Sequence, residues 1–89
     1  MNIEPRIGSV WYFTKETHLC CAKQKGSKWE RISEESIIIP PESFLTVVAF
    51  KDDYLLYQEI VLLYQNNLVI IFRAAFEDSI SRKKIKKLL

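Results

Sequence analysis

A histidine and a cysteine two residues apart come nearest to a catalytic set in this chain. His18 is the only histidine, and Cys20 follows it at i+2, so on a β-strand the two side chains share one face. Such a pair could supply a thiolate nucleophile and its general base. The alternative is a half-exposed histidine beside a cysteine that packs as a small hydrophobe, and we favour it. We therefore expect a protein that is not an enzyme, and we assign no catalytic residue.

The other chemistry-bearing residues do not assemble into a known motif. Zinc sites use four ligands, and the sequence has no second cluster of cysteine and histidine. Paired carboxylates at 34–35, 52–53 and 77–78 fall in expected turns or at a helix start, where turn chemistry and capping explain them. Gly8 and Gly26 are too few for a phosphate-binding loop. The sequence predicts no metal site and no cofactor.

Five positive charges fall within six residues of the closing stretch SRKKIKKLL. Residues 82–89 carry +5, whereas residues 1–81, with eight Lys and Arg against eleven Asp and Glu, carry −3. The basic residues are Arg82, Lys83, Lys84, Lys86 and Lys87. As an arm they could neutralise about three to five phosphates and give salt-sensitive nucleic-acid binding.

Three other interpretations of this basic segment stay open. It could be the solvated end of a helix, a segment that folds back on the acidic body, or a contact for a protein. A membrane anchor would need a broad apolar face, which the segment lacks. A domain that binds nucleic acid over its whole face is usually basic. The net negative charge of residues 1–81 therefore favours a protein partner.

Aromatic and basic residues near Gly26 form the best local candidate for a recognition surface. Lys28, Trp29 and Arg31 follow a turn that contains this glycine. We expect these three residues and Trp11 to contact a partner protein, because Trp and Arg are favoured at interface hot spots. The alternative for the aromatic residues is packing in the core, which a chain of 89 residues needs.

Alternating and β-branched patterns predict a chain rich in strands. Hydrophobic residues make up 48% of the sequence, enough for one domain with a small core. The segments that could form strands, from which we expect five to six strands, are 8–13, 17–23, 29–32, 37–39, 44–50, 55–64 and 68–73. Leu55–Tyr64 also fits a helix, but Val61 and the Asn-rich turn after it favour a strand.

Short connections without strand–helix alternation indicate antiparallel pairing. We predict a mainly β fold: a small antiparallel curled sheet or SH3-like barrel of five to six strands, with a short C-terminal helix. Residues 1–76 form the β-rich domain, and residues 77–89 form a basic C-terminal helix or tail.

The cysteine content and the hydropathy of the sequence indicate the cellular compartment of the protein. Cys20 and Cys21 are the only cysteines, and adjacent residues on a strand do not pair readily, so no disulfide framework is expected. No signal-peptide pattern and no apolar run near ~20 residues is present. We expect a cytoplasmic protein without a membrane contact.

Two resemblances bear on function. The segment Ile7-Gly8-Ser9-Val10-Trp11 resembles the first strand of barrel-shaped toxin ribonucleases, but the Arg-Pro segment expected after that strand is missing, so the activity is not carried over. In its size and its lack of a catalytic set, the chain resembles small accessory proteins of the phage type, which dock on a host enzyme. This likeness implies a non-catalytic protein-binding module that modulates or inhibits such an enzyme.

The alternative function is a nucleic-acid-binding small barrel that uses the basic C-terminal tail. A homodimer through an unpaired β edge is a further expectation, because an open edge on a small domain can pair with its own copy.

Overall fold

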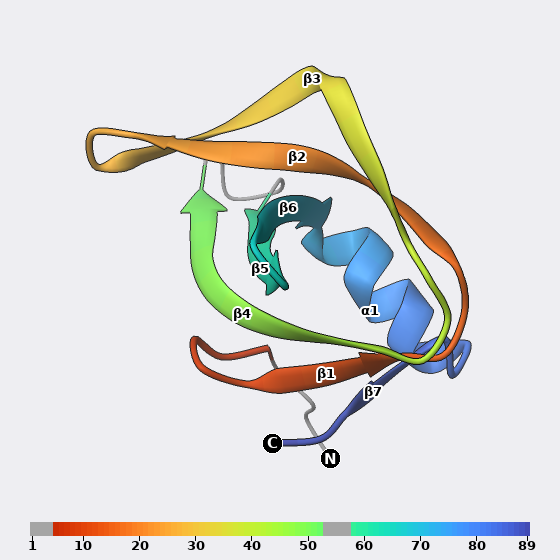
Figure 1. Cartoon of the computed structure of the whole chain (residues 1–89). Helices are drawn as coiled ribbons and strands as arrows, with labels where there is room; N and C mark the ends of the chain where they lie inside the picture. Colours follow the sequence, from red (N-terminus) through yellow and green to blue (C-terminus); the bar gives the residue numbers. More distant parts are fainter. Residues whose placement is uncertain (1–4, 53–57) are drawn as a thin grey trace.

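One antiparallel sheet curls around a single helix (Figure 1). The computed structural model describes residues 5–52 and 58–89. Its elements are β1 (Val10–Phe13), β2 (Thr17–Lys25), β3 (Lys28–Ile39), β4 (Ser43–Asp52), β5 (Gln58–Tyr64), β6 (Asn67–Phe72), α1 (Arg73–Ser81) and β7 (Ile85–Lys87). The strand order is β3-β2-β6-β5-β4-β1-β7, and neighbouring strands run antiparallel.

The predicted mainly β fold, a curled antiparallel sheet with a short C-terminal helix, is confirmed. Within the described ranges the sheet has seven strands rather than five or six, and it stays open, with β3 and β7 at its edges. The strand interpretation of Leu55–Tyr64 is confirmed from Gln58 onward, while residues 55–57 lie outside the described residues.

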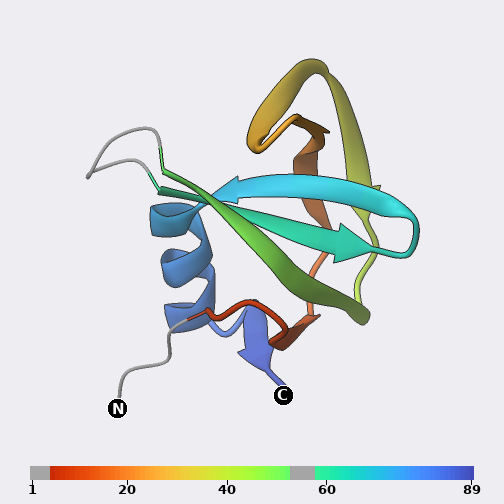
Figure 2. The ribbon, with the colours of Figure 1, turned by 90° about the vertical axis from the view of Figure 1, so that its left-hand side faces the viewer.

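β5 lies at the centre of the sheet and is buried on both faces. Ile60 and Leu62 point into the main core, to which α1 contributes Phe76. On the opposite face, Val61 belongs to a second cluster, which Trp29 of β3 helps to cover. Figure 2 shows α1 and the β2–β3 hairpin on different sides of the β5–β6 hairpin. Because β5 is buried on both faces, its sequence is a nearly continuous apolar run and does not alternate between apolar and polar residues.

β3 is a single strand of 12 residues, where the alternation had predicted two short strands joined by a polar connector. Cys20 and Cys21 are neighbours on β2, but their partners on β3 are Ser36 and Ile32. Residues 33–35 therefore bulge out of the ladder. A bulge bends its strand, and β3 is bent sharply in Figure 1.

The C-terminal segment is a helix followed by a strand, not one basic helix over 77–89. α1 ends in a Schellman motif: the Lys84 N–H donates to the Ser79 carbonyl at 2.8 Å, and the Lys83 N–H donates to the Ile80 carbonyl at 3.0 Å. Lys83 takes the left-handed conformation, with φ of 60°, and this reverses the chain. β7 can then pair with β1 and bury Ile85, a gain that a continued, solvent-exposed lysine helix would not provide.

Candidate functional site

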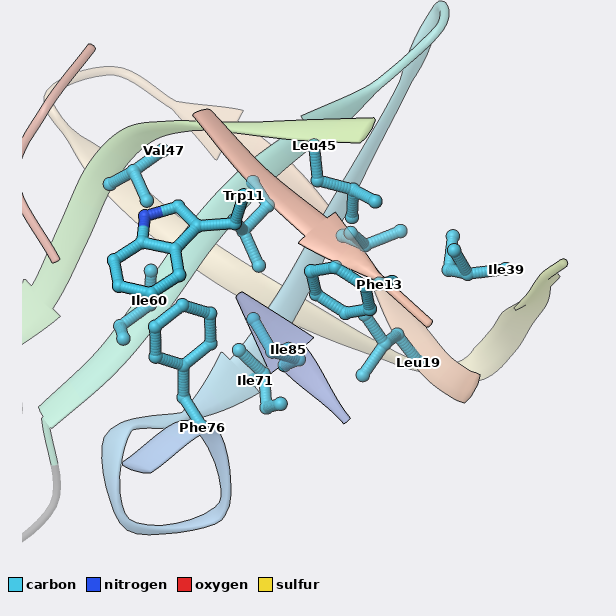
Figure 3. Packing of buried hydrophobic residues seen from close by; sticks show 12 residues of the cluster. Trp11, Phe13, Leu19, Ile39, Leu45, Val47, Ile60, Ile71, Phe76 and Ile85 are labelled. Carbon is cyan, nitrogen blue, oxygen red and sulfur yellow. The ribbon is translucent and has the colours of Figure 1, made fainter. Parts of the chain in front are cut away.

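Trp11 belongs to the core, so its assignment to a partner-binding surface is wrong. Its side chain is fully buried, and its ring packs edge-on against Phe76 with ring centroids 4.9 Å apart (Figure 3). The indole Nε1–H donates to Ser9 Oγ at 2.8 Å, which satisfies the polar group of the ring inside the core. β1 carries aromatic residues on both faces, and the sequence pattern did not show which face was buried.

The β2–β3 hairpin holds the other three residues expected to bind protein. Lys28 is exposed at the start of β3, beside the two-residue turn in which Gly26 has a φ of 64°. Trp29 is half-buried and packs against the second cluster, which includes Val61 and Ile70. Trp29 therefore contributes mainly to packing, and Lys28 stays available to a partner.

Arg31 is tied into a local ion pair. Its Nη2 donates to Glu59 Oε2 at 2.5 Å, and its Nε donates to the same oxygen at 3.1 Å. The guanidinium also lies 4.6 Å from the ring centroid of Phe72. Partial burial lowers the pKa of Arg31, but the hydrogen bonds and charges of Glu59 and Cys20 outweigh this and leave the pKa raised. Glu59 is only 5% exposed, so Arg31 neutralises a buried carboxylate.

The outer side of β3 is the longest open edge of the sheet. Beyond the bulge at residues 33–35, the segment 36–39 carries Ile38, whose side chain is 55% exposed. Pro40 then ends the strand. Glu34 and Glu35 are exposed within the bulge, so the middle of this edge is acidic.

The five basic residues near the C-terminus do not form a detached arm. Arg82 pairs with Asp78 at 3.1 Å, and Lys83 occupies the left-handed turn after α1. The Thr14 N–H donates to the Lys84 carbonyl at 2.8 Å, which aligns the chain with β1 before β7 begins. Lys86 and Lys87 lie on β7 opposite Tyr12 and Trp11. Lys86 and Lys87 thus lie on the edge strand β7, and the other three basic residues lie in the connection between α1 and β7.

An aromatic pair beside this basic edge, with Phe44 exposed and Tyr12 half-buried, was not assigned to a site from the sequence. Phe44 of β4 lies opposite Tyr12 of β1, and the ring centroids are 5.2 Å apart. Phe44 is 57% exposed, although its neighbour Leu45 is fully buried. The strand alternates inward and outward residues at this end, but an almost unbroken apolar run conceals the alternation. The available signal was the position of Phe44 as the second residue of β4, three residues after the Pro40-Pro41 pair that precedes the strand.

The residues considered for catalysis have mainly local contacts. The His18 imidazole lies 3.6 Å from Glu16, and both side chains are exposed. Cys20 and Cys21 are free thiols, each half-buried. Burial, with the nearby charges of Glu35 and Cys20, raises the pKa of the Cys21 thiol, which is opposite to the activation of a nucleophile. Among residues 5–52 and 58–89, no three His, Cys, Asp or Glu side chains gather in a way that could hold a metal ion.

No family model, no curated protein and no solved structure matches this chain. In the described part of the chain, no helix has the length and apolar character that a membrane crossing requires. The interpretation of the site therefore depends on its own chemistry: an open acidic edge at β3, and a basic edge at β7 beside the exposed ring of Phe44 on β4.

Proposed function

We propose that this chain is a small, non-catalytic protein-binding module that receives an extended segment of a partner along the outer edge of β3. The observation that carries the proposal is the open edge itself. β3 is the longest strand in the described part and pairs there with β2 alone. The backbone groups that point away from β2 can pair with an added strand.

The geometry of β3 favours its last four residues as the docking segment. The bulge at residues 33–35 interrupts the ladder, and the exposed Glu34 and Glu35 discourage indiscriminate pairing with other edges. Residues 36–39 follow the bulge in regular pairing with β2, and Ile38 offers an exposed apolar side chain. The partner that fits is an extended segment with an apolar residue opposite Ile38 and a basic residue near the two glutamates.

The proposal extends to the modulation or inhibition of a host enzyme by docking, in the manner of phage-type accessory proteins. The open β3 edge supports this extension, because a strand added there can dock the chain on a larger protein. We place the interaction in the cytoplasm, for which the two free thiols are the support.

Capture of partners from a lysate, with and without nuclease, tests the proposal. We expect tagged wild-type chain to retain a dominant protein after nuclease treatment, and Ile38→Lys to lose it by at least about ten-fold, as expected for a central apolar anchor. Phe44→Ala is the matched control, because Phe44 is equally exposed but lies on β4. Trp29→Ala is a poor probe, since it would also loosen the second cluster.

Two results would overturn the proposal. The first is an Ile38→Lys variant that is folded by circular dichroism and still captures the partner at full strength, which would remove β3 from the interface. The second is the loss of all captured material with nuclease, which would show that nucleic acid had carried it. If the retained protein is an enzyme, its activity with stoichiometric chain tests modulation directly.

A further inference from the structure

We propose that the outer face of β4, β1 and β7 is a binding surface for single-stranded nucleic acid. These three strands are consecutive at one end of the sheet, and Figure 1 shows them together with the C-terminus. β3 forms the opposite edge in the strand order, so this inference does not depend on the protein-binding edge proposed above.

Three side chains form one row across this face. Tyr12 of β1 is aligned with Phe44 of β4 on one side and with Lys86 of β7 on the other. Directly opposed residues in an antiparallel sheet project from the same face. The structure therefore places two aromatic rings and one ammonium group side by side.

The aromatic pair faces away from the core. Trp11 and Leu45, the chain neighbours of Tyr12 and Phe44, are fully buried, so the opposite side of these strands supplies the packing. The Phe44 side chain is 57% exposed, and its main ring contact is the tilted one with Tyr12. Tyr12 is half-buried, so the exposed Phe44 ring, supported by Tyr12, offers the face on which an unpaired base can stack, with little preference for sequence.

Lys86 on this face, with Lys83 and Lys84 in the turn before β7, supplies the attraction for phosphate, whereas Lys87 is paired with the inward-pointing Trp11 and projects from the other face. Lys83, Lys84, Lys86 and Lys87 are exposed, and in the described ranges none of them lies within ion-pair distance of a carboxylate. The neighbouring Arg82 differs, because Asp78 neutralises it. The Thr14 hydroxyl donates to the carbonyl oxygens of Lys83 and Lys84 at 3.2 and 3.1 Å, which fixes these residues beside the end of β1.

The conformation of Lys83 bears on the design of a test. The residue after the helix end in a Schellman motif is commonly glycine, since a left-handed φ strains residues with a Cβ atom. Here the position holds a lysine at φ 60°, so its replacement by glycine removes the charge and relieves the backbone at once.

The combination of rings and lysines favours single strands over other polyanions. A duplex hides its base faces in the stack, so Tyr12 and Phe44 would contribute nothing to its binding. An acidic protein segment would use the lysines but would gain little from flat ring faces. Single-stranded nucleic acid uses both.

Fluorescence anisotropy with a labelled oligothymidine of about 12 nucleotides tests the inference, since that length suits a small β surface. If three phosphates are contacted, the slope of log K against log salt is about −2, and affinity falls about 20-fold between about 50 and 200 mM salt. A duplex of the same length should bind more weakly, and an oligoglutamate of equal charge should compete poorly.

Substitutions on the surface separate binding from folding. Phe44→Ala should weaken binding about ten-fold, the loss expected for one stacked base, with the thermal midpoint almost unchanged. Lys86→Gln should reduce the salt slope by about 0.7, the value for one phosphate contact on a single strand. Lys83→Gly should weaken binding and yet raise the thermal midpoint, a combination that partial unfolding cannot produce.

Two variants away from this surface serve as controls. Lys25→Gln, an exposed lysine on the β2–β3 hairpin, and Ile38→Lys should leave oligothymidine binding intact. The inference is overturned if the duplex binds as tightly as the single strand, if Phe44→Ala changes nothing, or if oligoglutamate competes on equal terms. The last result would assign the surface to acidic proteins.

Discussion

At the scale of single residues, Arg31 shows how an apparent surface cation can be structural. Its guanidinium donates twice to one oxygen of Glu59, and it also lies over the ring of Phe72. Glu59 sits on the central strand β5, where its carboxylate is nearly inaccessible to water. A buried carboxylate without a partner destabilises the folded state. Losing Arg31 would therefore act mainly by leaving the carboxylate of Glu59 buried and unpaired.

We predict that Arg31→Met destabilises the fold by about 2–4 kcal/mol, somewhat below the cost of breaking a fully buried pair because Arg31 is partly exposed. Arg31→Met combined with Glu59→Leu should recover most of this loss, since no buried charge then remains. Urea unfolding, followed by tryptophan fluorescence, measures the free energy of unfolding of the single and the double variant. Lys28→Met is the control, with an expected change under about 0.5 kcal/mol because Lys28 is exposed. Equal stabilities for the single and double variants would refute the account.

At the scale of elements, β7 shows how one buried side chain can organise a charged segment. Ile85 is the residue of β7 that enters the main core, and Lys86 and Lys87 remain exposed on either side of the strand. Its hydrophobic burial holds the strand against β1. The lysines can therefore be displayed at fixed positions without themselves stabilising the fold.

Replacing Ile85 by alanine should cost about 2–4 kcal/mol, the usual loss for a large buried aliphatic side chain. It should also release β7, so that limited trypsin digestion cuts after Lys83 and Lys84 much faster than in the wild type. Leu88→Ala is the matched control, because Leu88 is half exposed and adjacent to the same strand. If the lysine segment were a solvated arm, Ile85→Ala would be neutral and trypsin would cut both proteins equally fast.

The strands and hairpins could be predicted from the sequence because their signals are local. Alternation identified most strand segments, and Gly26 marked the turn between β2 and β3. The pattern could not assign the faces of β1, where Trp11, Tyr12 and Phe13 are all aromatic. Only the packing of Phe76 from α1, far along the chain, determines that Trp11 points inward.

The candidate site was harder to predict from the sequence, because it also depends on contacts between segments that are far apart along the chain. Lys28 and the five basic residues near the C-terminus are exposed, as charged residues usually are, whereas Arg31 and Glu59 are not. The row that joins Lys86 to Tyr12 and Phe44 depends on pairing between segments more than thirty residues apart. Such register is set by the burial of Ile85 and Leu45 in a common core, which no local pattern contains.

At the scale of the whole molecule, the two open edges of the sheet carry opposite charge. Glu34 and Glu35 are exposed on β3, whereas the lysines are exposed on and before β7. A dimer with two-fold symmetry would place β3 against β3 or β7 against β7, and like charges would then face each other. Charge therefore disfavours the symmetric homodimer through a β edge and favours contact between β7 of one copy and β3 of the next.

We predict that the chain is monomeric near physiological salt, about 150 mM, where exposed charges are screened beyond about 8 Å. At low salt we expect weak head-to-tail association that grows with concentration and does not stop at a dimer, because a heterologous contact need not close. Sedimentation velocity at low and high salt measures this. Replacing both Glu34 and Glu35 by glutamine should suppress the association, because it removes the attraction for the lysines, and Glu16→Gln with Glu77→Gln serves as a control of equal charge change. A discrete dimer that persists at high salt would contradict the prediction, since only a symmetric, mainly apolar interface would resist screening.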